Sequence, residues 1–233
     1  MKMFKLVLMS MFFFGGNIVA KNEIKVPEIK METVYINGNK NYEVVKPIFI
    51  DNVKFRAVND ELNILIHIEE LKKEEEEIEL EDPEGHKNHE LFIQPTILYA
   101  DSDIISFTIS GYQYTGGAHG GSWLTSFLVN RKTGEIITDT LKTENKKVFN
   151  KIQKYIKENL EGIFFEDEYT SEYLMNEAVV SQLDKETINI SYMSYTIAPY
   201  AAGIPEFEYN IKTKKLYFLD SYSEKGTQKI EIK

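Results

Sequence analysis

His119 is the residue of this sequence best suited to do chemistry, because it lies in a loop of small residues, 114–121, with the sequence YTGGAHGG. A histidine next to a hydroxyl such as that of Ser122, or next to an acid, can act as a general base in hydrolysis. The sequence has no GxSxG nucleophile elbow, no cysteine, and no acid near His119 in the sequence that would orient its ring. We therefore favour a structural histidine that fixes the bend, and we predict no catalytic residue and no cofactor.

A second set of residues has the side-chain types that bind divalent metal ions. His86 and His89 are three positions apart, with Asp82, Glu84 and Glu90 close by. Imidazole and carboxylate groups can hold zinc, but a structural zinc site needs four well-placed ligands. Because this segment is highly charged, we predict a solvated loop without a metal site. The sequence alone leaves open whether the two histidines take up an ion.

Aromatic and small residues gather around His119 and again in the segment 195–209, which has the sequence YTIAPYAAGIPEFEY. Glycine adopts positive φ without a steric penalty, and small residues let one loop pack on another, so we predict that the two loops meet. Aromatic side chains on such loops can stack on sugars or anchor a protein interface. For the only tryptophan, packing in the core is the competing interpretation. The residues predicted to form a binding surface are Tyr112, Tyr114, Thr115, Gly116, Gly117, His119, Trp123, Tyr195, Pro199, Tyr200 and Gly203.

The first residues of the chain have the features of a secretory signal peptide. Two lysines precede an apolar run, residues 6–16, which is too short to span a bilayer, and Ala20 supplies a small residue at the expected cleavage site. We predict a signal peptide at residues 1–20 and an exported protein, either periplasmic or extracellular. We expect no membrane span after the signal peptide is removed, because no later segment is long and apolar enough.

The charge of the chain limits its partners. The formal net charge is −10, and removal of residues 1–20 would take away Lys2 and Lys5 but no acid, which gives −12. Such a surface repels nucleic acid, whose binding depends on cationic contacts with phosphate. It would instead attract a basic partner and speed the encounter by electrostatic steering. Because the chain has no cysteine, an exported fold must rely on its hydrophobic core.

Periodicity predicts the elements of the first part of the chain. The alternating runs 29–36 and 42–50 flank the turn signal NGN and predict a β-hairpin. Residues 59–80 fit a helix or a strand, and their glutamates and lysines favour the helix. Four strand-like runs, 91–100, 104–114, 123–130 and 135–141, then predict an antiparallel meander. The glycine loop of His119 connects the second and third of these runs.

The second part of the chain mixes helices and strands. Val148, Ile152 and Ile156 recur at helical spacing, with Thr143 as a candidate N-cap and Gly162 as a stop signal. A weaker helix is predicted over 171–183, and strands are predicted over 187–198, 206–211 and 215–222. This order predicts an α+β fold in which an antiparallel β-sheet is packed by helices on one face.

The two loop motifs also resemble a known family. The segment YTGGAHG, followed by a strand, the turn KTGE, a helix and finally YTIAPYAAGIPEFEY, is similar to the RsiV-like domain. That family is named for the extracellular part of a lysozyme-sensing anti-sigma factor, and it is similar to modules that precede some peptidoglycan deacetylase domains. The resemblance implies an RsiV-like domain at 99–233 and a loosely matching strand and helix region at 21–98, or one compact unit of both.

The resemblance also implies a function. It predicts an exported envelope module that recognises lysozyme, another cationic protein or peptidoglycan. We expect binding alone, because we find neither a sigma-binding segment nor a deacetylase catalytic domain in the sequence. Two other hypotheses stay open: a wall-directed hydrolase that uses His119, and a structural domain with no ligand.

Overall fold

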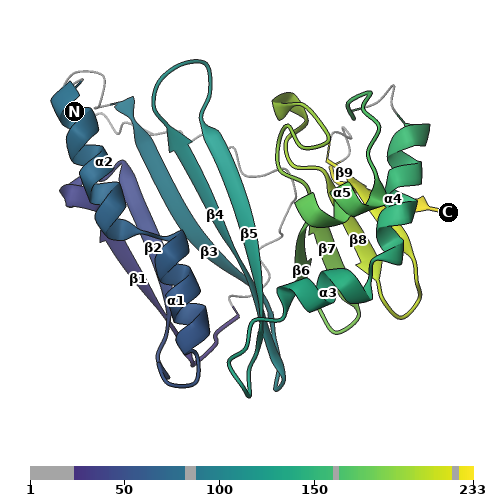
Figure 1. Ribbon diagram of the computed structural model, residues 1–233, viewed down its shortest axis with the longest axis horizontal. Coiled ribbons are helices and arrows are strands. Elements are labelled where there is room, and N and C mark those ends of the chain that lie inside the picture. Colours follow the sequence, from purple (N-terminus) through teal and green to yellow (C-terminus); the bar gives the residue numbers. More distant parts are fainter. Residues whose placement is uncertain (1–23, 82–87, 160–162, 222–225) are drawn as a thin grey trace, which may run out of the picture.

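The computed structural model describes residues 24–81, 88–159, 163–221 and 226–233, and it confirms the α+β fold (Figure 1). The strands form two five-stranded sheets instead of one. The expected signal peptide at residues 1–20 lies outside the described residues. None of the described helices is long and apolar enough to cross a membrane.

The first sheet contains the predicted hairpin and most of the predicted meander. Its strands, in spatial order, are β1 (Ile29–Tyr35), β2 (Tyr42–Phe49), β3 (Glu90–Ala100), β4 (Ile104–Tyr114) and β5 (Gly121–Asn130). The NGN turn forms the short 3-10 helix η1 (Ile36–Gly38), in which Asn37 and Gly38 adopt positive φ. The boundary predicted between residues 98 and 99 falls inside β3, so both predicted parts contribute strands to this sheet.

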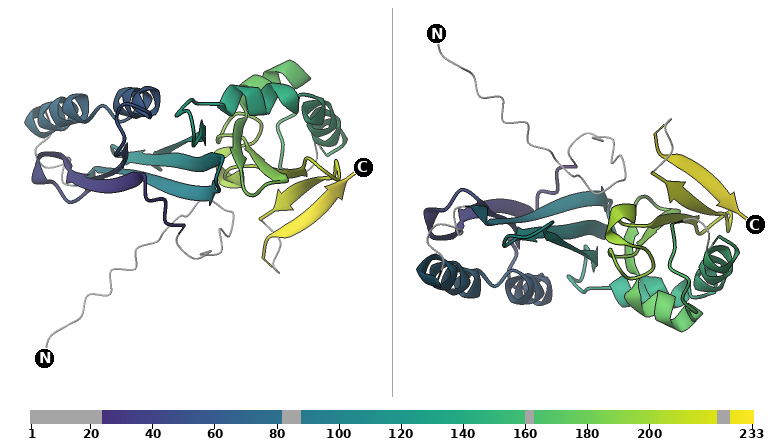
Figure 2. Two further views of the ribbon diagram at one scale, coloured as in Figure 1. Left: turned by 90° about the horizontal axis from the view of Figure 1, so that it is seen from below. Right: turned by 90° about the horizontal axis from the view of Figure 1, so that it is seen from above.

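The prediction of a purely antiparallel sheet is wrong at one position, because β2 and β3 are parallel. Parallel neighbours need a long crossover connection. Two helices supply it, α1 (Arg56–Leu65) and α2 (Ile68–Glu81), where the sequence predicted one. Between the two helices, Ile66 has non-helical backbone angles, so the chain changes direction there. Its side chain is buried and anchors this bend in the core. Both helices lie on one face of the first sheet (Figure 2).

The second sheet is antiparallel throughout. Its strands, in spatial order, are β10 (Gln228–Ile232), β9 (Leu216–Asp220), β8 (Glu206–Asn210), β7 (Thr187–Ser191) and β6 (Val179–Gln182). The three helices beside it are α3 (Thr138–Glu144), α4 (Lys147–Glu158) and α5 (Ser171–Glu177). Their apolar residues pack on one face of the sheet to form the second hydrophobic core.

Several predicted elements in this part are wrong. The strand expected over 135–141 is an isolated bridge at Ile136 followed by helix α3. Thr143 lies within α3, and the N-cap of α4 is Lys146. The helix expected over 171–183 ends at Glu177, and its last residues form strand β6. Strand β10 was not predicted.

The two halves meet where β6 packs against β3, β4 and β5. The Ser126 hydroxyl donates to the carbonyl of Val180 at 2.6 Å, and the backbone N–H of Gln182 donates to the Ser106 hydroxyl at 3.0 Å. Leu128, although it belongs to β5, packs in the second core and is only 3% exposed. We call this contact region the buried junction.

Candidate binding site

The two motif loops meet through their side chains, as predicted, and both lie at the upper edge of the molecule in Figure 1. One loop joins β4 to β5, and the other joins β7 to β8 and contains the 3-10 helix η3 (Tyr200–Ala202). The His119 ring stacks on the Tyr200 ring, with centroids 4.0 Å apart and planes at 14°. The Tyr195 hydroxyl lies 3.5 Å from His119 Nε2. These three residues define what we call the aromatic junction.

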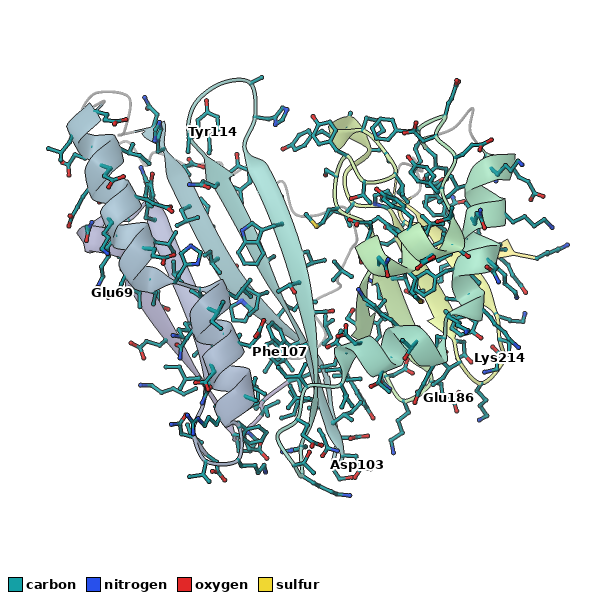
Figure 3. All side chains as sticks on the ribbon, in the orientation of Figure 1. Glu69, Asp103, Phe107, Tyr114, Glu186 and Lys214 are labelled. Carbon is teal, nitrogen blue, oxygen red and sulfur yellow. The ribbon has the colours of Figure 1, made fainter. Side chains whose placement is uncertain are left out.

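The conformation of the first loop depends on its glycines. Gly116 and Gly117 have φ values of +95° and +97°, and an added Cβ at either position would meet no atom within 4 Å. Both are therefore needed for their backbone conformation and not for space. The Tyr114 hydroxyl, at the end of β4 in Figure 3, donates to the Gly117 carbonyl at 3.0 Å and braces the turn. Gly120 instead allows close packing, because a Cβ there would lie 2.5 Å from the Tyr112 ring.

The second loop holds a tyrosine in an unusual conformation. Tyr195 has a φ of +69°, which is rare and strained for a bulky residue, and it is 59% exposed. Its N–H donates to the carbonyl of Ala198 at 2.8 Å, so the turn is closed by a backbone bond. Gly203, with a φ of +62°, donates its N–H to the Tyr200 carbonyl at 2.9 Å and ends η3. These bonds position both tyrosine rings beside His119.

His119 is held by backbone and rings. Its Nδ1 lies 3.0 Å from the Gly120 carbonyl, so a neutral ring with a proton on Nδ1 donates there and accepts from Tyr195 through Nε2. In the described part of the chain, neither ring nitrogen is hydrogen-bonded to a carboxylate or to Ser122. The ring is therefore held by its stack on Tyr200, and among the described residues no acid is placed to orient it as a general base.

The remaining predicted site residues are only partly brought together. Thr115 and Pro199 lie exposed on the two loops. Tyr112 lies beneath the first loop, and burial raises the pKa of its phenol, with smaller contributions from Glu90 and Tyr200. Trp123 packs against the core of the first sheet, so close over Gly111 that an added Cβ there would lie 2.1 Å from the indole. Core packing, the competing interpretation, therefore describes this tryptophan.

Sequence reasoning missed Glu206, which follows the second loop directly. Its carboxylate accepts hydrogen bonds from Asn189 Nδ2 at 3.0 Å and Ser191 Oγ at 3.3 Å. Burial raises the pKa of this carboxyl and outweighs the lowering by its two donors. The available signal was the alternation in β8, which places Glu206 and Glu208 on the face opposite Phe207.

The metal-binding question falls partly on residues that the structure does not describe. His86, Asp82 and Glu84 lie outside the described residues. Within the described ranges, no group of three or more His, Asp and Glu side chains is arranged to hold a metal ion.

Comparison with known proteins relates the chain to two described families, one by sequence profile and one by fold. A family profile described as deacetylase PdaC matches residues 20–122, which include β1 to β4 and the loop of His119. A DUF3298 family protein from Pseudomonas aeruginosa PAO1 has a crystal structure that matches with a TM-score of 0.50 and 15% sequence identity, covering 79% of this chain and 90% of that chain. The chain shares the fold of that protein.

A second DUF3298 family member, from Bacteroides fragilis NCTC 9343, matches with a TM-score of 0.41 and 16% identity, over 79% of this chain and 89% of that chain. No curated protein sequence gives a significant match. The PdaC and DUF3298 matches are consistent with the RsiV-like resemblance, although neither carries that name.

Proposed function

We propose that this protein is an exported, noncatalytic binding protein of the bacterial envelope, related to the RsiV-like domain. Its aromatic junction would contact lysozyme, another cationic protein, or peptidoglycan. The observation that carries the proposal is the stack of His119 on Tyr200 with Tyr195 beside it, an exposed aromatic surface built by two loops from different sheets.

The chemistry of this surface suits recognition. Tyrosine offers a large rigid ring and a polar hydroxyl, which is why it is enriched at the centre of interfaces. The Tyr195 and Tyr200 rings already lie 6.2 Å apart and nearly parallel, at 28°. Rings held in place before binding lose little conformational entropy when a partner arrives.

The charge of the chain favours a basic partner over a neutral one. The net charge of −10 would attract a cationic protein at a distance and orient its approach. Helix α2 carries much of the acidity, with a run of glutamates on an exposed surface of the first half. Steering of this kind weakens as salt screens the charges, and the proposal can therefore be tested by salt dependence.

The experiment measures retention of the protein by lysozyme and by purified peptidoglycan at low and high ionic strength. We expect Tyr200→Ala and Tyr195→Ala each to weaken binding by about tenfold or more, because truncated interface tyrosines are typical hot spots. Tyr35→Ala is the matched control, since this tyrosine on β1 is 47% exposed and belongs to the outer edge of the first sheet.

The outcome distinguishes the proposal from its alternatives. Salt-sensitive capture of lysozyme that depends on Tyr200 but not on Tyr35 supports the cationic partner. Salt-insensitive retention by peptidoglycan with the same residue dependence supports the wall component. Retention of neither material by the folded wild-type protein would refute the proposed function.

A further inference from the structure

A groove lies between the edge of the first sheet and the start of the second. It has a volume of about 590 Å³ and runs between strand β5 and the turn from α5 into β6. Leu124 and Thr125 line one side, and Ala178, Val179 and Met193 line the other. Thr138, Asp139, Thr140 and Lys142 of α3 line its lower end. We call it the β5 groove.

Strand β5 is the last strand of the first sheet, so one side of its backbone has no neighbouring strand. Leu128 shows which residues direct their backbone groups to that side. Its N–H donates to Thr138 Oγ1 at 2.9 Å, and its carbonyl accepts from the N–H of Ile137 at 2.7 Å. Both groups therefore point away from β4.

Backbone direction alternates along a strand, so Ser126, Leu124 and Ser122 point the same way as Leu128. The Ser126 carbonyl accepts from Thr138 Oγ1 at 3.5 Å, at the closed end of the edge. Further up, the outward N–H and C=O groups of Leu124 and Ser122 make no hydrogen bond with the described part of the chain. They form a short open edge that starts in the groove at Leu124 and continues beyond it to Ser122. An extended backbone can add to an edge of this kind.

The walls of the groove are acidic. Glu61, Asp139 and Glu177 line it, and Lys142 is the only cationic residue among its lining residues. The Lys142 ammonium donates to the Asn176 carbonyl at 3.3 Å, so it is already engaged with the wall. Three carboxylates against one lysine leave a negative groove, which favours a positively charged occupant.

We infer that the β5 groove binds an extended basic peptide segment of a partner protein, which adds to the β5 edge as a short strand. The open backbone groups match the N–H and C=O groups of an extended peptide, which alternate at the same strand spacing. Alternate side chains of the added strand would face Leu124 and Met193, and the others would face the carboxylates. This site is separate from the aromatic junction and does not depend on its function.

The test uses the full chain and a capped pentapeptide, Lys-Val-Lys-Val-Lys, followed by NMR amide hydrogen exchange. We expect the peptide to slow exchange at Leu124 and Ser122 by tenfold or more at saturation. The peptide Glu-Val-Glu-Val-Glu should not bind. A Lys-Val-Lys-Val-Lys peptide N-methylated at every residue, which keeps the charge but loses its backbone donors, should bind at least tenfold more weakly.

Two variants of one residue isolate the backbone contribution. Leu124→Pro removes the outward N–H at an edge position where proline is tolerated, and it should abolish peptide binding. Leu124→Val keeps the N–H and should bind the peptide at least tenfold more tightly than Leu124→Pro. Tyr200→Ala should retain peptide binding, which separates this site from the proposed function.

Equal binding of the acidic or the N-methylated peptide would overturn the inference, as would unchanged exchange at Leu124 and Ser122 at millimolar peptide. The peptide comparison decides the question even if Leu124→Pro does not fold, because it requires no change to the protein.

Discussion

The two halves of the molecule touch at two places that are built in different ways. The buried junction joins them through Leu128 in the second core and through hydroxyl groups of Ser106 and Ser126 that bond to the backbone of β6. The aromatic junction joins them through stacked rings on exposed loops. Leu128 and Ser106 of the first are buried, whereas the second faces solvent.

Under the proposed function, this difference separates stability from recognition. A hydrogen bond lost in the buried junction leaves a polar group that water cannot reach, which carries the full desolvation penalty. A ring removed from the aromatic junction is replaced by water at small cost. The buried junction is thus expected to fix the arrangement of the two sheets, and the aromatic junction is left accessible to a partner.

The largest effect is expected at Leu128. Leu128→Ala should lower the free energy of unfolding by about 2–5 kcal/mol, because it removes a buried side chain and leaves a cavity between the two halves. Urea denaturation measures the change. Leu80→Ala on α2 is the control, since Leu80 is 82% exposed and its truncation should change stability by less than about 0.5 kcal/mol. Similar values for the two variants would contradict the assigned role of the buried junction.

The next largest effect is expected at Ser106, which is fully buried. Ser106→Ala leaves the N–H of Gln182 without its acceptor and should lower the free energy of unfolding by about 1–3 kcal/mol. Ser110→Ala is the matched control on the same strand, because its exposed hydroxyl bonds to the Gln94 carbonyl and water can replace it. A neutral Ser106→Ala would show that the hydroxyl does not hold β6.

The sequence predicted the features that depend on the residues of a single strand or loop. Strict alternation and the NGN turn predicted β1 and β2, and small residues in both motifs predicted that the loops meet. The number of sheets could not be predicted, because alternation marks each strand but does not identify its neighbours. The β2–β3 pair is parallel only because two helices intervene, and no residue in either strand signals this.

Tertiary contacts overrode local propensity in other places. Residues 135–141 are rich in β-branched residues and predicted a strand, but Thr138 begins helix α3, where its hydroxyl bonds to the N–H of Leu128. In the second motif loop, the positive φ of Tyr195 could not be predicted, since tyrosine rarely adopts it. Glu206 was missed because its partners on β7 are distant in sequence.

A smaller effect is expected at the aromatic junction. Tyr200→Ala should lower the free energy of unfolding by about 0.5–1.5 kcal/mol, the range typical of a stacked pair. A double-mutant cycle with His119→Ala, followed by urea denaturation, measures the interaction energy of the two rings. A loss as large as that of Leu128→Ala would mean that the aromatic junction also holds the two halves together.

The smallest effect concerns Glu206, a polar residue at the end of the exposed loop that nevertheless behaves as a buried one. Because its folded-state pKa is raised, the folded protein holds this proton more tightly than the unfolded chain, whose glutamate pKa is about 4.3. Its contribution to stability is therefore greatest below about pH 4 and decreases as the pH rises through the folded-state pKa. Glu206→Gln removes the ionisation and keeps an oxygen that can accept from Asn189.

The stability of Glu206→Gln relative to wild type should therefore increase from pH 4 upward and level off once the wild-type carboxyl is ionised. Urea denaturation across that pH range measures the difference. If the difference in the free energy of unfolding does not change with pH, Glu206 is solvated in the folded protein, as the exposed residues of the aromatic junction are. The solvated region around the aromatic junction would then extend to Glu206, the first residue of β8.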